Sequence, residues 1–432
     1  VSDDGGPYTL WQDQTTQTSA AYTGTVGDTY SFYSVATDNV GNVEPTPTVA
    51  EATTTIASGV IQNGKTLTVT GTTGADVLMI EFDRTFSVVG VEVNGVLQDY
   101  STSDVNNIVV NGVSGNDTLT VYSPPTEDAT VALSSGTISF AVKDFNITSS
   151  NIPNIFYYAK VTDTAKLTDP AGANTLTVTP GYEWMAGTNF NLVVIGGNQV
   201  AAYSNGSGLD TADVQAATSA QYTAYVGSSF DFGYYPNGTY HHYEYGFATV
   251  DAIDTSGLVI ADFYGNGSAA FQASVTGGSM SSQGFVTEAS GFGRLNNYAG
   301  GAGDTIQLTT VGNSGYMQEF VAGEYAAYVD DVGVANGMAS WAFGFQTVAG
   351  IGGGANTEVV FLPNVGNSNL VASGNSATMS TASETNVATG FATATAYASS
   401  GSNTDHVAVI DFALGLLGNW TLAGGVYHGS AD

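Results

Sequence analysis

The chain has 432 residues, with six lysines and arginines against 38 aspartates and glutamates and a formal net charge of −32. So few cations exclude nucleic acid and anionic membrane surfaces as partners, because both are bound through clustered basic side chains. The absence of cysteine excludes disulfides and thiolate-ligated metals. A hydrophobic content of 43% excludes wholesale disorder, while 55 glycines and only 10% charged residues favour short strands joined by tight turns. The sequence therefore predicts an all-β protein.

Alternation of apolar and polar side chains divides residues 1–56 into short predicted strands. These strands are Tyr8–Gln12, Ala20–Thr25 and Thr29–Thr37. The last is rich in tyrosine, ends in A-T-D-N-V-G-N and is followed by a proline-marked strand. This pattern resembles the C-terminal part of a fibronectin type III module, which implies a partial β-sandwich over residues 1–56.

Fibronectin-like modules have about 90 to 100 residues, so the first strands of the sandwich are missing. Either the sequence is a piece of a longer chain, or a second copy of the chain supplies the strands by β-strand addition. We expect the uncovered apolar side chains to form that interface. They are Tyr8, Trp11, Tyr30 and Phe32.

Residues 57–155 predict the first section of a β-solenoid. Turns of the frame G-x-[DN]-x-L each precede an alternating strand, as expected for a chain that climbs one coil per turn. The frame resembles the core of the nonapeptide calcium repeats of parallel β-helices. It occurs at Gly74–Leu78, Gly115–Leu119 and, further on, Gly172–Leu176. Asn94-Gly95, between two valine-rich runs, predicts an antiparallel hairpin within this section.

Residues 156–432 are dominated by repeats that open on a Gly-Phe pair. The openers are Gly246-Phe247, Gly291-Phe292, Gly344-Phe345 and Gly390-Phe391, with a weaker copy at Gly196. They recur every 45 to 53 residues, a period typical of solenoids. Gly-Asn pairs follow the openers in the same phase, at Gly265, Gly312, Gly366 and Gly418.

These repeats predict an elongated parallel β-solenoid in which the opener phenylalanines are stacked, equivalent core residues. Two coils per repeat would give about 16 rungs at the usual strand spacing. Taken together, the fibronectin-like segment, the G-N-D-T-L turns and the Gly-Phe repeats resemble large secreted surface proteins of Planctomycetes and related bacteria. The resemblance implies architecture and location, and it says little about activity.

Calcium is the expected candidate cofactor, because stacked Asp and Asn turns with nearby carbonyls offer the oxygen ligands of a hard cation. The chosen ligands are Asp76, Asp117, Asp262 and Asp304. A plainer alternative is that Gly-Asp and Gly-Asn supply turn geometry alone, and that the negative charge gives solubility.

Tyr234–Tyr245 combines a Pro-Asn-Gly turn with five tyrosines and the adjacent His241 and His242. Adjacent side chains on a strand point to opposite faces, so the pair does not form a metal site by itself. We expect a hairpin whose tyrosines, Tyr240 and Tyr243 among them, cover a core edge, contact another subunit or hold a glycan.

Carboxylate pairs at Asp330-Asp331 and Asn403–Asp405 lack the basic and histidine partners of the polysaccharide-acting β-helix enzymes. The favoured function is therefore a non-enzymatic, extracellular structural protein that assembles with copies of itself, through strand complementation or solenoid contacts, into a surface fibre or layer. The alternatives are a carbohydrate-binding adhesin that contacts surface polysaccharide, and a degenerate polysaccharide-acting enzyme. No apolar run reaches the roughly 18 residues of a membrane span, so no membrane insertion is expected.

Overall fold

The regular elements of this computed structural model are all strands. It describes residues 1–24, 28–55, 59–197, 199–205, 209–215, 220–225, 229–234, 240–310, 317–323, 326–332, 339–362 and 366–422. No helix occurs among these residues, and none therefore is long and apolar enough to cross a membrane. The prediction of an all-β protein is confirmed. The chain divides into two compact units, unit 1 (residues 1–168 and 186–197) and unit 2 (residues 169–185 and 198–432).

Unit 1 begins with a three-stranded antiparallel sheet of β1 (Ser2–Asp3), β2 (Thr29–Phe32) and β3 (Ala52–Thr55). Trp11 and Tyr22 lie against the aromatic side chains of β2: the Tyr22 ring centroid is 5.1 Å from that of Tyr30 and 5.2 Å from that of Phe32. Residues 1–24 and 28–55 contain no second sheet facing this one, so the fibronectin-like sandwich is not confirmed.

The predicted strand Tyr8–Gln12 is wrong, and the described part of Ala20–Thr25 also lacks strand structure. Both segments contain aromatic residues among the apolar ones that suggested alternation. Trp11 packs its ring 5.2 Å from Tyr22, and Tyr22 packs on β2, so these side chains cover the sheet instead of extending it. Periodicity over so few residues does not distinguish these two uses of an aromatic side chain.

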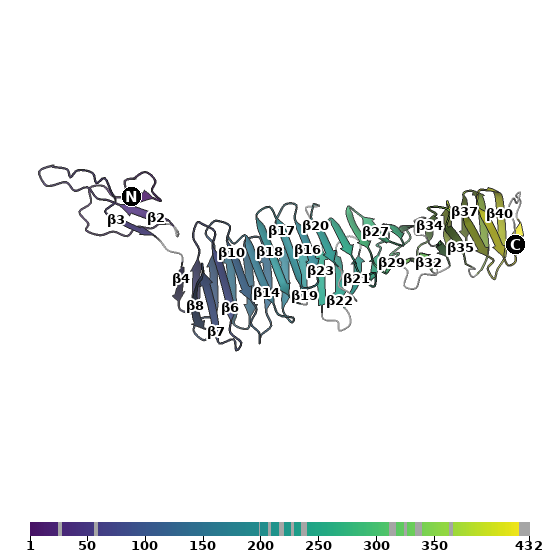
Figure 1. Cartoon of the computed structure of the whole chain (residues 1–432), viewed down its shortest axis with the longest axis horizontal. Coiled ribbons are helices and arrows are strands. Elements are labelled where there is room, and N and C mark those ends of the chain that lie inside the picture. The colour runs from purple at the N-terminus through teal and green to yellow at the C-terminus, as the bar shows by residue number, and fades with distance from the viewer. Residues whose placement is uncertain are drawn as a thin grey trace. The chain divides into compact units, whose positions relative to one another are not determined.

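From β4 onward the chain winds as a parallel β-solenoid, as predicted, and it makes about eight turns. The strands up to residue 196 are β4 (Gly59–Asn63), β5 (Thr66–Thr70), β6 (Val77–Phe82), β7 (Val88–Val93), β8 (Val96–Ser101), β9 (Asn107–Asn111), β10 (Thr118–Tyr122), β11 (Thr130–Ser134), β12 (Thr137–Val142), β13 (Phe145–Ser150), β14 (Asn154–Ala159), β15 (Thr164–Thr168), β16 (Thr175–Thr179), β17 (Tyr182–Gly187) and β18 (Phe190–Gly196). Figure 1 shows β10, β14 and β18 of unit 1 side by side, paired in parallel.

The remaining strands are β19 (Gln199–Tyr203), β20 (Thr211–Gln215), β21 (Ala220–Tyr225), β22 (Ser229–Tyr234), β23 (Tyr240–Tyr245), β24 (Thr249–Ile253), β25 (Ile260–Tyr264), β26 (Ala270–Ser274), β27 (Gly277–Ser282), β28 (Phe285–Ser290), β29 (Arg294–Tyr298), β30 (Thr305–Thr309), β31 (Gln318–Ala322), β32 (Ala326–Asp331), β33 (Ala339–Phe343), β34 (Thr347–Ile351), β35 (Thr357–Phe361), β36 (Ser368–Gly374), β37 (Ser376–Ser380), β38 (Thr385–Thr389), β39 (Thr393–Tyr397), β40 (Asn403–Ile410), β41 (Ala413–Leu417) and β42 (Thr421–Leu422).

The solenoid strands belong to two sheets, and the two sheets face each other within each unit. Sheet I contains β6–β8, β10, β14, β16–β18, β20, β24, β26–β28, β30, β34, β36–β38, β40 and β42, and sheet II contains the others from β4 onward. In unit 1 the ring of Phe82 in sheet I stacks 6.0 Å from that of Phe140 in sheet II. In unit 2, sheet II places the buried ring of Phe320 against Gly350 of sheet I, where a Cβ would lie 2.2 Å from the ring. Gly350 therefore makes room for this aromatic core residue.

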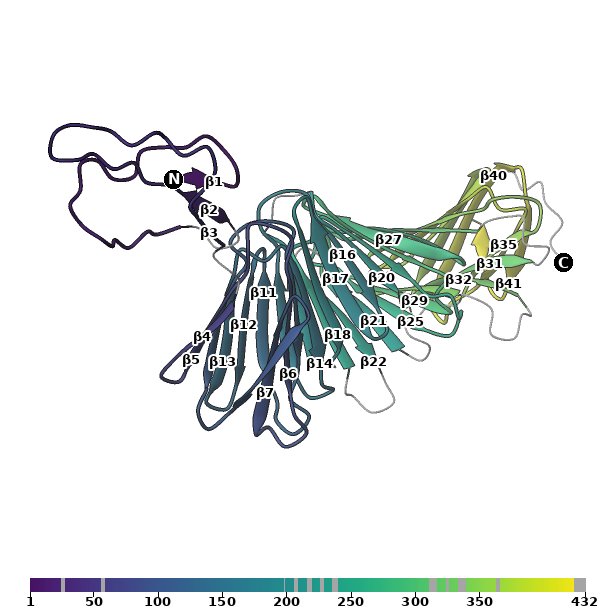
Figure 2. The same ribbon diagram turned by 60° about the vertical axis from the view of Figure 1, so that its left-hand side comes forward.

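Between β9 and β38 each repeat contains five strands, whereas the described strands after Gly390-Phe391, β39 to β42, alternate between the two sheets without a meander. After an opener the chain forms one strand in one sheet, one in the other, and then a three-stranded antiparallel meander in the first sheet; from Gly246 these are β24, β25 and β26–β28. The next repeat starts in the opposite sheet with β29, β30 and the meander β31–β33. Figure 2 shows the corresponding meander β11–β13 of unit 1. Because three of the five strands form a local meander, the expectation of about 16 rungs is wrong.

The openers hold the chain where it leaves a meander. Gly246, Gly291, Gly344 and Gly390 all have a φ between 73° and 79°, in the left-handed region that favours glycine. At Gly291 a Cβ would also lie 2.0 Å from the carbonyl oxygen of Asp254. The following phenylalanines are buried, as predicted: Phe247, Phe292, Phe345 and Phe391.

The opener rings do not form one stack, contrary to the prediction. Phe247 and Phe345 precede strands of sheet I, whereas Phe292 and Phe391 precede strands of sheet II, because successive repeats start in opposite sheets. Phe345 instead packs edge-on against Phe271, with ring centroids 5.1 Å apart.

Two further features follow from this repeat. Asn151, with φ of 57°, and the buried Ile152 occupy the opener position between β13 and β14, so the repeat begins earlier than the Gly-Phe pairs indicate. Gly418 follows β41 and does not precede the third strand of its repeat as Gly265 and Gly366 do. The Gly-Asn landmark at Gly312 lies outside the described residues.

The predicted hairpin at Asn94-Gly95 is confirmed, since it joins the antiparallel strands β7 and β8.

Candidate functional site

In the predicted calcium turns, the Asp or Asn of the repeated motif G-x-[DN]-x-L lies at a buried corner, immediately before a strand. Asp76, Asp117 and Asp304 are all buried although they are charged. The leucine two residues after Asp76 and Asp117 is buried as well, at Leu78 and Leu119. The G-x-[DN]-x-L frame therefore marks a corner residue and a core residue of the solenoid.

Four corner carboxylates accept a hydrogen bond from the backbone of a neighbouring coil, whereas Asp76 accepts one from the N–H of Thr72 in its own turn. Asp117 Oδ1 accepts from the backbone N–H of Asp76 at 2.8 Å, and Asp304 Oδ1 accepts from that of Ala269 at 2.6 Å. Asp304 Oδ2 also accepts from the N–H groups of Gly300 and Gly301, at 2.6 and 3.2 Å. Equivalent bonds join Asp163 to Ala129 and Asp210 to Asn174. These buried side chains link coils, because a buried backbone N–H needs an acceptor.

Asp262 differs from the other three residues. It lies within β25, not in a turn, and its Oδ1 accepts a hydrogen bond at 2.7 Å from Nδ2 of Asn296 in the neighbouring β29. Burial raises the pKa of the Asp117 carboxyl, and this effect is larger than the lowering by the hydrogen bond from the Asp76 N–H. Calcium binding at Asp76, Asp117, Asp262 and Asp304 stays a prediction.

Two corner carboxyls of unit 2 share a hydrogen bond. Asp169 and Asp210 are buried, and the pKa of Asp169 is raised to about 7 by burial, by this hydrogen bond and by the charge of Asp210. The N–H of Asn205, which donates to Asp169 Oδ2 at 3.3 Å, opposes the shift. Asp169 is therefore held largely as the neutral acid below neutral pH.

We expect this pair to make stability depend on pH. A folded-state pKa of about 7 above the ordinary 3.8 means that the stabilising contribution is complete below pH 3.8 and is lost as the pH rises to about 7. Asp169→Asn should remove this part of the slope, measured as the difference in melting temperature from wild type between pH 4 and 8. The exposed Asp411→Asn should leave the slope unchanged. A variant that keeps the wild-type slope would show that the two carboxyls do not share a proton.

A second cluster, which the sequence interpretation missed, lies in the core of unit 2. Glu183 of β17, in sheet I, meets His242 and Glu244 of β23, in sheet II; all three side chains are at most 2% exposed. One carboxylate or imidazole atom from each lies within 4.8 Å of those of the other two. Glu183 Oε1 contacts His242 Nδ1. Burial lowers the pKa of His242 to about 3, so the imidazole is neutral.

The signal for this cluster is the spacing H-x-E in Tyr240–Tyr245. Residues two apart on a strand point to one face, so His242 and Glu244 project together, as the alternation rule requires. The sequence interpretation considered only the adjacent pair His241-His242, which cannot share a face. Glu183 lies 59 positions from His242 and is brought to it by the facing of the two sheets, which no local pattern reveals.

The predicted interface aromatics fall into two groups. Tyr8 and Trp11 are each 41% exposed, while Tyr30 is buried and Phe32 half-buried beneath the chain's own Tyr22. Part of the apolar face of β2 is thus covered within the chain, and a partner chain at this sheet stays a prediction. Tyr243 is half-buried; the side chain of Tyr240 lies outside the described residues.

Aromatic side chains also stack along the outer face of sheet II. Tyr264, Tyr298 and Phe343 occupy equivalent positions of β25, β29 and β33, with ring centroids 4.7 and 5.0 Å apart and ring planes tilted by 8° and 17°. Tyr203 and Tyr245 stack in the same way. Both faces of the Tyr298 ring are occupied by its two neighbours. The geometry of this aromatic ladder fits reinforcement of the sheet.

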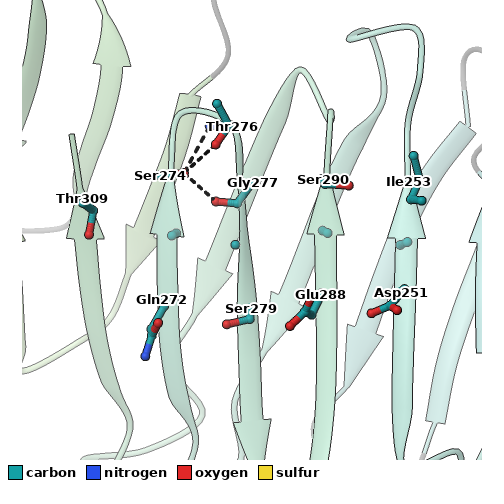
Figure 3. A pocket seen from close by; sticks show the side chains of 14 residues that line it. Asp251, Ile253, Gln272, Ser274, Thr276, Gly277, Ser279, Glu288, Ser290 and Thr309 are labelled. Atoms are coloured by element: carbon teal, nitrogen blue, oxygen red, sulfur yellow. Dashed lines mark hydrogen bonds between the residues drawn. The ribbon is translucent and has the colours of Figure 1, made fainter. Parts of the chain in front are cut away.

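Rows of polar residues cross the outer face of sheet I over β24 to β30, around a hollow at Gly277 and Gly278 (Figure 3). Asp251 and Glu288 are direct neighbours in the paired strands β24 and β28, and Asp213 continues the row in β20. The pKa of Asp251 is raised by partial burial and by the charge of Asp213. Like charges in register across a sheet are destabilising, so the charge of Asp213 adds to the effect of burial on the pKa of Asp251.

The residues considered as acidic pairs for an enzyme lie on two strands, Asp330 and Asp331 on β32, and Asn403 and Asp405, both buried, on β40. Asp330 and Asp331 are consecutive in β32, so their side chains point to opposite faces of sheet II.

At one end of the solenoid in unit 1, two strands are paired on one side only. Among the described residues β4 pairs with β5 alone and β8 with β7 alone. Consecutive side chains of β8 are both uncovered, Val96 being 61% and Leu97 49% exposed, and Ile61 of β4 is 68% exposed. Two edge strands therefore present free backbone groups together with large apolar side chains.

Compared with known proteins, the chain matches no protein-family model, no curated protein and no solved structure.

Proposed function

We propose that this chain is a non-enzymatic, extracellular structural protein, a self-assembling subunit of a bacterial surface fibre or layer. The observation that carries the proposal is the pair of bare edge strands β4 and β8. Unpaired N–H and C=O groups on a strand edge are a template for pairing with another chain. Natural edge strands are usually protected by lysine, proline or a bulge. β4 contains no charged residue or proline, β8 contains one charged residue, Asp99, and the two strands expose Ile61, Val96 and Leu97.

The occupant that fits these edges is a second copy of the chain. A second copy has strands with the same spacing and the same kind of outer face. Its pairing with β8 would extend sheet I, and its pairing with β4 would extend sheet II. The burial of several hundred Å² of apolar surface would contribute many kcal/mol at about 25 cal/mol per Å². Pairing would also satisfy the backbone groups of both strands.

Other features support a structural role. The corner carboxylates link coil to coil, and the aromatic ladder joins neighbouring strands on the outside. Both features stabilise the stacked coils of the solenoid. The acidic, cysteine-free composition and the resemblance to secreted surface proteins support an extracellular location. The adhesin alternative rests on Tyr240 and Tyr243 and stays a prediction; the ring of Tyr243 stacks on that of Tyr245, with centroids 6.2 Å apart.

We expect sedimentation velocity to show concentration-dependent species larger than the 44.2 kDa monomer. A double variant, Ile61→Lys with Val96→Lys, should remain monomeric, because charges on an edge oppose strand pairing. A matched control is Val371→Lys: Val371 is also exposed, but its strand β36 is paired on both sides, with β37 and β40. The control should assemble like wild type.

The proposal is overturned if wild type stays monomeric at every concentration, or if the double variant assembles as wild type does. Circular dichroism melting of all three proteins establishes that any difference in assembly is not a loss of fold.

A further inference from the structure

The buried cluster of unit 2 combines two carboxylates and one imidazole from facing sheets. We propose that Glu183, His242 and Glu244 bind a divalent transition-metal ion of the zinc class, which joins sheet I to sheet II. The inference is independent of the proposed assembly.

Burial of the Glu183 carboxylate favours a bound cation. A carboxylate removed from water without a compensating cation or hydrogen bond is strongly unfavourable, and Glu183 is only 1% exposed. Neither oxygen of the Glu183 carboxylate accepts a hydrogen bond from the described part of the chain. The carboxylate contacts Nδ1 of His242. Val200 and Ala202 of β19, both buried, lie beside His242 and Glu244 in register.

The second argument is charge balance. In their ionised form the two glutamates carry two negative charges, which a divalent ion neutralises. The chain has six lysines and arginines in total and none beyond Arg294, so it supplies few cations of its own. A bound metal ion would make this part of the core electrically neutral.

The third argument is donor chemistry and reach. Imidazole with carboxylate is a donor set for zinc and related ions, whereas calcium takes oxygen ligands alone. Ligand atoms at about 2.0 to 2.2 Å from one ion lie at most about 4.4 Å apart. The donor atoms of the cluster already fall within 4.8 Å of one another, so small side-chain movements bring all three onto one ion.

The location adds a physical role. β17 and β23 belong to opposite sheets, and Glu183 and the two residues of β23 are far apart in the sequence. An ion held by both strands fixes the distance between the sheets at a place where the core would otherwise contain repelling carboxylates. Metal binding should therefore raise the stability of the folded chain by mass action.

The test uses the full chain, stripped of metal and titrated with Zn²⁺, with Co²⁺ as a visible probe. We expect one Zn²⁺ per chain, a melting temperature that rises with zinc concentration, and a visible Co²⁺ absorption band. Glu183→Gln should weaken zinc binding by at least about 100-fold, since a direct ligand matters at least as much as the outer residues around a metal. It should also abolish the Co²⁺ band. Excess Ca²⁺ should not displace the zinc.

Two exposed residues provide matched controls, because the acidic surface also attracts zinc weakly. Glu288→Gln and His406→Gln change the same residue types at exposed positions and should bind zinc as wild type does. If Glu183→Gln does not fold, His242→Leu removes a ligand while keeping an apolar core, and the same losses are expected. The proposal is overturned if stripped wild type takes up no stoichiometric zinc, or if Glu183→Gln or His242→Leu binds it as tightly as wild type. A metal-free wild type that melts independently of zinc would mean that protons, not a metal, neutralise the cluster.

Discussion

Phe345→Ala is expected to destabilise the folded chain by about 3 to 5 kcal/mol, the usual range for removing a large buried aromatic ring. Phe345 follows an opener glycine, is buried and packs edge-on against Phe271 at 5.1 Å. Its removal would leave a cavity where the chain passes from a meander to the next strand, and neighbouring strands held by parallel pairing cannot collapse into it. The free energy of unfolding in urea measures the loss.

Tyr397→Ala is the matched control for this change. Tyr397 is also an aromatic residue of a repeat, but it is 38% exposed in β39. It should cost less than about 1.5 kcal/mol, because much of its side chain already contacts water. Equal losses in the two variants would contradict the assignment of Phe345 as a core residue of the repeat.

Asp304→Ala is expected to cost about 3 kcal/mol or more. The carboxylate accepts hydrogen bonds from three backbone N–H groups, those of Ala269, Gly300 and Gly301. Alanine would leave these donors without an acceptor in a buried corner, and each unsatisfied buried group costs about 1 to 3 kcal/mol. Chemical denaturation and hydrogen exchange of the Ala269 amide measure the effect.

Asp304→Asn separates the structural role of the corner from calcium binding. Asparagine keeps one of the two acceptor oxygens, and Asn403 fills a comparable corner by accepting from the Ser399 N–H at 2.9 Å. The substitution should therefore cost less than Asp304→Ala. If calcium binds at Asp304, added calcium should raise the melting temperature of wild type and not that of Asp304→Asn. Identical melting of wild type with and without calcium would leave the corner role alone.

Much of the fold could be predicted because local patterns encode it. The G-x-[DN]-x-L frames located the corners at Asp76 and Asp117, and the Gly-Phe pairs located left-handed glycines followed by buried rings. Each of these features depends on a few consecutive residues. The meander of each repeat escaped prediction because its strands carry the same alternation as the parallel ones. Two turn sequences specific for hairpins did reveal antiparallel strands: Asn94-Gly95, and the Pro-Asn-Gly of Tyr234–Tyr245, whose flanking strands β22 and β23 pair antiparallel as predicted.

The candidate site shows the same limit. His242 and Glu244 could have been paired from their spacing on one strand, whereas Glu183 reaches them only through the packing of one sheet on the other. Asp262 was assigned to a turn because a Gly-Asn pair follows it, but the alternation Ile260–Tyr264 places it within β25. Contacts between residues far apart in the sequence, such as Glu183 with His242, therefore could not be predicted from local patterns.

The central claim, self-assembly through the edges of β4 and β8, is tested most directly by electron microscopy of the purified protein. Wild type should form regular fibres or layers with a fixed repeat, and the Ile61→Lys, Val96→Lys double variant should give isolated particles under the same conditions. Isolated wild-type particles at all concentrations, or identical assemblies in the double variant, would contradict the claim.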